Sequence, residues 1–299
     1  MYKHILVPLD GSALAEAALP AVRFLAQELH AVITLVHILE SDAPATIHGE
    51  RHLGRREEAE EYLTEVRNRL SDSQLKVEWH VHGETTEDVA TAMAAHEDEL
   101  GPDLIVMCTH GRSGIRRILM GSMAQRVVAA GRIPVLLMRP DGPHAGESFR
   151  LQSLLAPLDG EPAHERGFQV ALELARITHA QLQLLSVVPT MGALSGRDAA
   201  MGRFMPGTTQ AILEYAEQNL KGYLLREAAK AEAAGVAPVT VLRHGEPAPA
   251  IAETAETLDS TLIVLATHGR AGTDAFWNNS VAATVHAQTK RPLLLVPAK

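Results

Sequence analysis

Residues 108–122, CTHGRSGIRRILMGS, combine three glycines with three arginines directly after an apolar run of strand-like composition. Glycines at 111 and 114 allow a sharp turn and a close approach of the backbone to a ligand. Backbone N–H groups in such a turn, and at a helix start near Gly121 and Ser122, bind anions well. The stretch therefore indicates a phosphate site. The alternative is an ordinary β-to-α turn whose arginines are solvated.

Signatures of other phosphate sites and of nucleophilic catalysis are missing. The sequence contains neither G-x-x-x-x-G-K-[ST] nor G-x-G-x-x-G, and it has no G-x-S-x-G elbow. Cys108, the single cysteine, ends an apolar run without an obvious activating pair. We expect a small buried residue there, with a reactive thiol as the alternative. No catalytic residue is assigned.

Fifteen histidines raise the question of a metal site. His48 and His52 are four residues apart and lie near Glu50 and Glu57, so a zinc site is conceivable. No cysteine accompanies them, and solvated histidines are commoner than metal ligands. We therefore expect no bound metal at these histidines.

The chain repeats itself, and the repeat explains its length. Two copies of about 140–150 residues fit two domains, 1–140 and 149–299, joined by a Gly- and Pro-containing linker at 141–148. The matched stretches are HILVPLDGS (4–12) with SLLAPLDGE (153–161), DLIVMCTHGRSG (103–114) with TLIVLATHGRAG (261–272), and RIPVLLMRP (132–140) with KRPLLLVPA (290–298).

Within the first copy, short apolar runs alternate with helical patterns. This alternation predicts an α/β fold with two tandem doubly wound Rossmann-like domains, each with a five-stranded parallel sheet. Ligands of such sheets bind beyond the carboxyl ends of the strands, where PLD and CTHGRSG supply polar residues. The expected strands are 4–9, 31–39, 74–81, 103–109 and 134–139, and the expected helices are 13–29 with a kink at Pro20, 55–70, 86–99 and 119–131.

Composition narrows the class of protein. A hydrophobic content of 46% and a charged content of 21% are typical of a soluble globular chain. The net charge of −9 argues against a nucleic-acid partner and an anionic membrane surface. No apolar run approaches the roughly 18 residues of a membrane helix. The early Asp10 argues against a signal peptide, and one cysteine suits a reducing compartment, so we expect the cytoplasm.

The motifs V-P-L-D-G-S, L-V-H-I, T-H-G-R-S-G and a final G-S resemble the universal stress protein family, here as a tandem member. The nucleotide signature of that family is G-x-x-G, nine residues, then G-[ST]. Gly111, Gly121 and Ser122 match it, while Cys108 stands at the first glycine. The backbone of Cys108 still offers the same groups to a ligand.

The resemblance implies an ATP site, with Mg²⁺, in the first domain. Asp10 and the backbone beside it would meet the nucleoside, and the backbone of Ile38 would meet adenine. The glycines and the serine would hold ribose and phosphates. The implied site residues are Pro8, Leu9, Asp10, Ile38, Cys108, Gly111, Arg112, Gly114, Gly121, Ser122 and Met123.

The second copy departs from the signature. Ala266 and Asn279 replace its first and last glycines, Asp274 stands where Arg116 does, and Glu161 replaces Ser12. Added carboxylates oppose a phosphate chain, so we expect an empty or weak second site. The apolar runs IPVLLM and RPLLLV would be exposed edges in isolated domains. In the family such strands pair across a dimer, which implies an intrachain pseudo-dimer and leaves a homodimer open.

The leading hypothesis is a cytoplasmic stress-response protein regulated by bound ATP without fast catalysis. A nucleotide-free interaction module of the same fold is the alternative, and a slow ATPase or adenylyl-transfer enzyme is a further one. Residues 191–209 lack clear periodicity and suggest a long loop, whether a lid, a partner surface or a disordered segment.

Overall fold

The computed structural model divides the chain into two compact units. Of the described residues, the first unit holds those within 1–150 and 290–297, and the second holds those within 151–267, 280–289 and 298. The structure describes residues 1–39, 46–47, 50–51, 53–71, 75–82, 100–109, 124, 127–128, 133–143, 148–194, 196–267 and 280–298.

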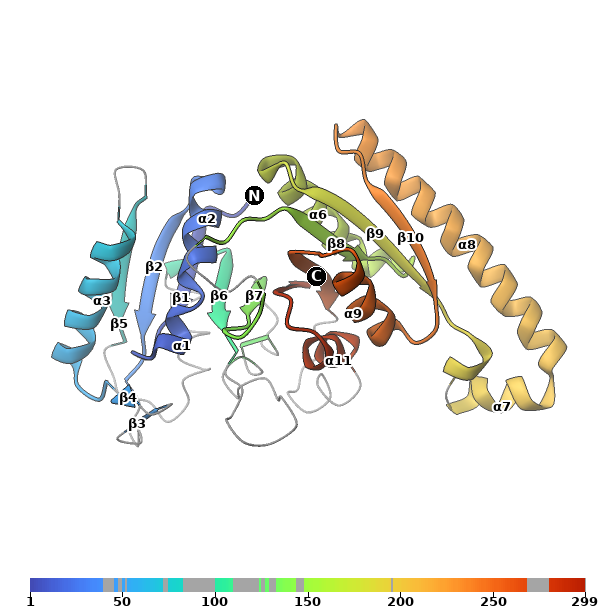
Figure 1. The fold of residues 1–299 in the computed structure, drawn as a ribbon, viewed down its shortest axis with the longest axis horizontal. Helices are drawn as coiled ribbons and strands as arrows, with labels where there is room; N and C mark the ends of the chain where they lie inside the picture. Colours follow the sequence, from blue (N-terminus) through green and yellow to red (C-terminus); the bar gives the residue numbers. More distant parts are fainter. Residues whose placement is uncertain are drawn as a thin grey trace. The chain divides into compact units, whose positions relative to one another are not determined.

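The first unit is built on a parallel sheet in the order β5-β2-β1-β6-β7, to which β12 adds an antiparallel strand (Figure 1). The three central strands are mostly apolar and buried, because both faces of the sheet are covered. The strands are β1 (His4–Pro8), β2 (Val32–His37), β5 (Val77–Val81), β6 (Leu104–Cys108), β7 (Val135–Met138) and β12 (Leu293–Pro297).

Three helices and a short hairpin complete the described part of the first unit. They are α1 (Ala13–Glu16), α2 (Leu19–Leu29), α3 (Arg56–Leu70), β3 (Thr46–Ile47) and β4 (Glu50–Arg51). The predicted single helix with a kink at Pro20 is wrong in detail, because the helix is interrupted before Leu19. Pro20 lies in the first turn of α2, where its missing N–H group costs no hydrogen bond.

The second unit has four parallel strands in the order β10-β9-β8-β11. Its strands are β8 (Ser153–Pro157), β9 (Gln181–Val188), β10 (Val239–His244) and β11 (Leu262–Thr267). Its helices are η1 (Pro162–His164), α6 (Glu165–Thr178), η2 (Met191–Ala193), α7 (Gly196–Phe204), α8 (Pro206–Ala233), α9 (Pro247–Thr257) and α11 (Val281–Gln288).

The segment 191–209 is largely helical, so the predicted long loop is wrong. It holds η2, α7 and the first turn of the 28-residue helix α8 (Figure 1). Pro206 begins α8 at a position where proline is tolerated, and residues 197–201 contain good helix formers between scattered glycines. The Gly- and Met-rich composition had hidden this helical pattern.

The tandem α/β fold is confirmed. The five expected strands of the first repeat are present, and so is the helix predicted at 55–70. The helices expected at 86–99 and 119–131 lie almost wholly outside the described residues. Within the described ranges, no helix has both the length and the apolar character to cross a membrane.

Candidate functional site

Four residues form a row just beyond the carboxyl ends of four adjacent strands in the first unit. Continuing the strand registers past Pro8 places Ile38, Asp10, Thr109 and Arg139 side by side, after β2, β1, β6 and β7. The chain winds from β1 toward β2 and β5 on one side, and from β6 toward β7 on the other. Asp10 and Thr109 therefore flank the switch point, which is the usual ligand position in such sheets.

The Asp10 carboxylate is held in place by Ser12. Its Oδ1 accepts a hydrogen bond from the Ser12 N–H group at 2.9 Å and another from the Ser12 hydroxyl at 2.6 Å. The same hydroxyl caps α1 by accepting from the Ala15 N–H group at 3.2 Å. Gly11 makes the intervening turn with φ of +89°, and a β-carbon there would lie 2.8 Å from Leu53. The sequence P-L-D-G-S thus fixes one carboxylate at the switch point.

His37 supports the same edge from β2 and is 1% exposed. Its Nδ1 lies 2.8 Å from the Leu9 carbonyl oxygen, and its Nε2 lies 3.1 Å from the Leu53 carbonyl oxygen. The ring therefore connects the residue before Asp10 to the segment that precedes α3. The motif L-V-H-I contained this histidine, but sequence reasoning assigned it no role, because Leu9 and Leu53 are distant in sequence.

Acidic and apolar side chains are among the described residues near Asp10. Tyr62 on α3 is half-buried, and this burial, followed by the charges of Glu16 and Asp10, raises the pKa of its hydroxyl far above the usual range. Glu16 also pairs with Arg69 at 2.7 Å, which joins α1 to α3. Ile38 is 7% exposed, so an apolar side chain lies in the row next to the carboxylate.

Cys108 ends β6 and is 3% exposed. Burial raises the pKa of its thiol to about 12, and the charge of Asp10 adds to the effect. The side chain is therefore a protonated, buried thiol at neutral pH, as the sequence predicted.

Cys108 should consequently resist alkylation in the folded protein. At pH 8 we expect iodoacetamide to label native protein at least about a hundredfold more slowly than protein in urea, because the thiolate is scarce and enclosed. Mass spectrometry of the labelled fraction against time gives both rates. A native rate equal to that in urea would contradict the buried placement.

In the second unit, the residues that correspond to Asp10 and His37 make different contacts. Asp159, the counterpart of Asp10, accepts from the Glu161 N–H group at 3.0 Å, and its other oxygen lies 2.6 Å from His164 Nδ1. Ser186 replaces His37 and donates to the Leu158 carbonyl at 2.9 Å. Each oxygen of the second carboxylate thus has a partner within the chain.

Five of the predicted site residues lie together at the carboxyl edge of the first sheet: Pro8, Leu9, Asp10, Ile38 and Cys108. Six others lie outside the described residues: Gly111, Arg112, Gly114, Gly121, Ser122 and Met123. The same is true of His48, His52, Asp274 and Asn279. Within the part of the chain that is described, no three His, Cys, Asp or Glu side chains are grouped to hold a metal.

The model of the universal stress protein family matches residues 1–139 and again residues 151–297. The chain belongs to the universal stress protein family. It is a tandem member, because the two matches are separate and together cover nearly the whole sequence.

Two relatives of this universal stress protein each match about half of it. Universal stress protein MJ0531 of Methanocaldococcus jannaschii is 31% identical over 146 residues, which is 46% of this chain and 83% of that protein. Universal stress protein YxiE of Bacillus subtilis is 28% identical over 151 residues, 46% of this chain and 100% of its own. A universal stress protein structure from Archaeoglobus fulgidus has a TM-score of 0.69 at 18% identity, covering 99% of this chain and 98% of its own, which shows a shared fold.

Proposed function

We propose that the first repeat binds ATP, with Mg²⁺, at the carboxyl edge of β2, β1 and β6, and that the bound nucleotide regulates a stress response in the cytoplasm. The observation that carries this proposal is the Asp10 carboxylate, fixed by Ser12 at the switch point of the sheet. Ligands of doubly wound sheets bind at this place.

The residues present suit a nucleotide. A fixed carboxylate accepts hydrogen bonds from ribose hydroxyls, and the neighbouring apolar Ile38 suits the face of a base. The glycine signature at 111 and 121 supplies the family's phosphate-binding pattern. Bound ATP would act as a regulatory ligand here, and we assign no catalytic residue to the site.

Calorimetric titration with Mg-ATP tests the proposal with a matched pair of variants. We expect about one site per chain with micromolar affinity, because a few charge-assisted hydrogen bonds are partly offset by the cost of association. Asp10→Asn should weaken binding at least about tenfold by removing an ionised acceptor. Asp159→Asn, the equivalent change in the second repeat, should leave the affinity unchanged.

Other results would favour the competing functions. No binding at millimolar ATP would support the nucleotide-free interaction module, which Cys108 at the first glycine position favours. Two sites per chain would refute the inactive second repeat. Formation of ADP or of an adenylylated product, lost in Asp10→Asn, would support an enzyme.

A further inference from the structure

Arg139, the residue after β7, is a buried cation with one unused donor group. Its side chain is 5% exposed. Nε lies 3.2 Å from Asp141 Oδ1 and Nη2 lies 3.5 Å from Asp141 Oδ2, whereas Nη1 is buried without a hydrogen-bond partner among the described residues. A buried donor of this kind is costly unless something accepts from it.

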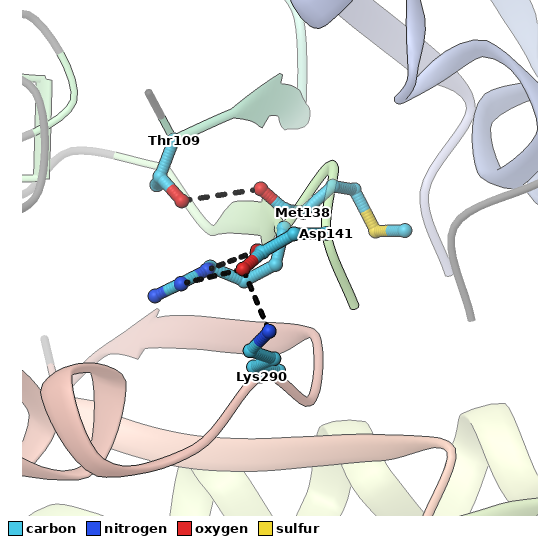
Figure 2. Close-up of polar contacts among 5 residues, drawn as sticks. Thr109, Met138, Asp141 and Lys290 are labelled. Carbon is cyan, nitrogen blue, oxygen red and sulfur yellow. Dashed lines mark hydrogen bonds and ion pairs between the residues drawn. The ribbon is translucent and has the colours of Figure 1, made fainter. Parts of the chain in front are cut away.

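Arg139, Asp141 and Lys290 together carry an excess of positive charge. Asp141 lies between the guanidinium and Lys290, whose Nζ is 2.9 Å from Asp141 Oδ2 (Figure 2). Burial opposes ionisation of Asp141, but its bonds with Lys290 and Arg139 hold the pKa of that carboxyl below its usual range. One carboxylate thus faces two cations among these three groups, and an anion on the side of Nη1 would balance the charge.

Arg139 also occupies the right place for a phosphate. It continues the row of Ile38, Asp10 and Thr109 across the strand ends. Adjacent strands are about 4.8 Å apart, so the Cα atoms of Arg139 and Asp10 are separated by about 10 Å. An arginine side chain covers much of that distance toward a phosphate chain whose ribose is held at Asp10. The planar guanidinium is also well suited to phosphate oxygens.

We propose that Arg139 is a phosphate-binding residue of the first repeat, with Nη1 donating to an oxygen of the nucleotide's phosphate chain. The assignment rests on the proposed nucleotide site. Pro297 occupies the matching position in the second repeat, where it offers neither charge nor a donor. The contact therefore distinguishes the two repeats. It also makes affinity depend on the number of phosphates.

Titration of the full-length protein with ATP, AMP and adenosine tests this contact. Arg139→Gln should weaken ATP binding about 10- to 100-fold, which corresponds to the loss of one charge-assisted hydrogen bond, and should leave adenosine binding unchanged. The ATP affinity of Arg139→Lys should lie between those of the wild type and Arg139→Gln, because lysine keeps the charge but lacks the planar guanidinium. Lys76→Gln, which removes an exposed cation paired with Glu78, is the matched control and should leave ATP affinity unchanged.

Thermal unfolding of each variant first establishes that it is folded. Equal ATP affinity of Arg139→Gln and the wild type would overturn the role of Arg139 and leave the nucleotide site standing. An equal loss of ATP and adenosine binding would make Arg139 structural. If the wild type binds no nucleotide, the proposed function fails. Titration with tripolyphosphate then tests whether Arg139 binds an anion. Binding lost in Arg139→Gln would support that contact, whereas no binding would overturn it.

Discussion

Replacing Leu294 with alanine is expected to lower the free energy of unfolding by about 2–5 kcal/mol, the usual cost of truncating a fully buried leucine. Leu294 lies on β12, is 2% exposed, and pairs with Leu136 of β7, which is 1% exposed. By sequence Leu294 belongs to the second repeat, yet β12 is counted with the first compact unit. The loss should therefore appear in the unfolding of the first unit, which urea denaturation followed by circular dichroism and tryptophan fluorescence would measure.

A double-mutant cycle with Leu136→Ala separates the strand pairing from general loss of packing. Residues directly opposite on antiparallel strands are expected to couple by about 0.2–1 kcal/mol or more when both are buried. Val281→Ala in α11 is the surface control, since Val281 is 42% exposed and should change stability by less than about 0.5 kcal/mol. Strictly additive effects of the two leucine substitutions would contradict direct pairing of β7 with β12.

The strands could be predicted because their pattern is local. ILVP and LIVMC are uninterrupted apolar runs, and each has a counterpart in the second copy, so the sequence indicates each of these strands twice. Helix interruptions were harder to predict. The break before Leu19 and the helices within 191–209 depend on proline position and on glycines that interrupt the apolar pattern without ending the helix.

The part of the candidate site that lies within sequence motifs could also be predicted. Asp10 and Ser12 are neighbours in sequence, so their hydrogen bonds follow from the P-L-D-G-S stretch. The roles of His37 and Arg139 could not be predicted in the same way. The contact of His37 with Leu53 depends on how a segment 16 residues away returns to β2. Arg139 Nη1 has no hydrogen-bond partner among the described residues, and this arrangement depends on the turn that brings Asp141 to the other guanidinium nitrogens.

The two repeats also differ in a side-chain contact that sequence comparison did not identify. Sequence comparison predicts a weak second site from Ala266, Asn279 and the added carboxylates. The structure adds one observation at that site, since His164 Nδ1 lies 2.6 Å from the Asp159 carboxylate. Alanine stands at the matching position 15 of the first repeat. The contact between His164 and Asp159 therefore has no counterpart at the matching alanine of the first repeat.

His37→Ser is expected to lower the free energy of unfolding by about 2–4 kcal/mol. Serine is the residue at the matching position of the second repeat, where the Ser186 hydroxyl donates to the carbonyl of Leu158, the residue after β8. The shorter side chain cannot reach the Leu53 carbonyl, so that group loses its 3.1 Å contact and the space of the ring is left empty. Chemical denaturation of the variant and the wild type at the same pH measures the difference.

The matched variant Ser186→Ala isolates the contribution of the shared bond. It removes one hydrogen bond to the Leu158 carbonyl and should cost about 1 kcal/mol. The difference between the two variants then measures what the first repeat gains by holding Leu9 and Leu53 with one ring. Because the Leu9 end of that contact adjoins Asp10, His37→Ser should also weaken ATP binding, whereas Ser186→Ala should not. Equal stability losses in the two variants, with ATP affinity intact in both, would show that the Leu53 contact supports neither the fold nor the site.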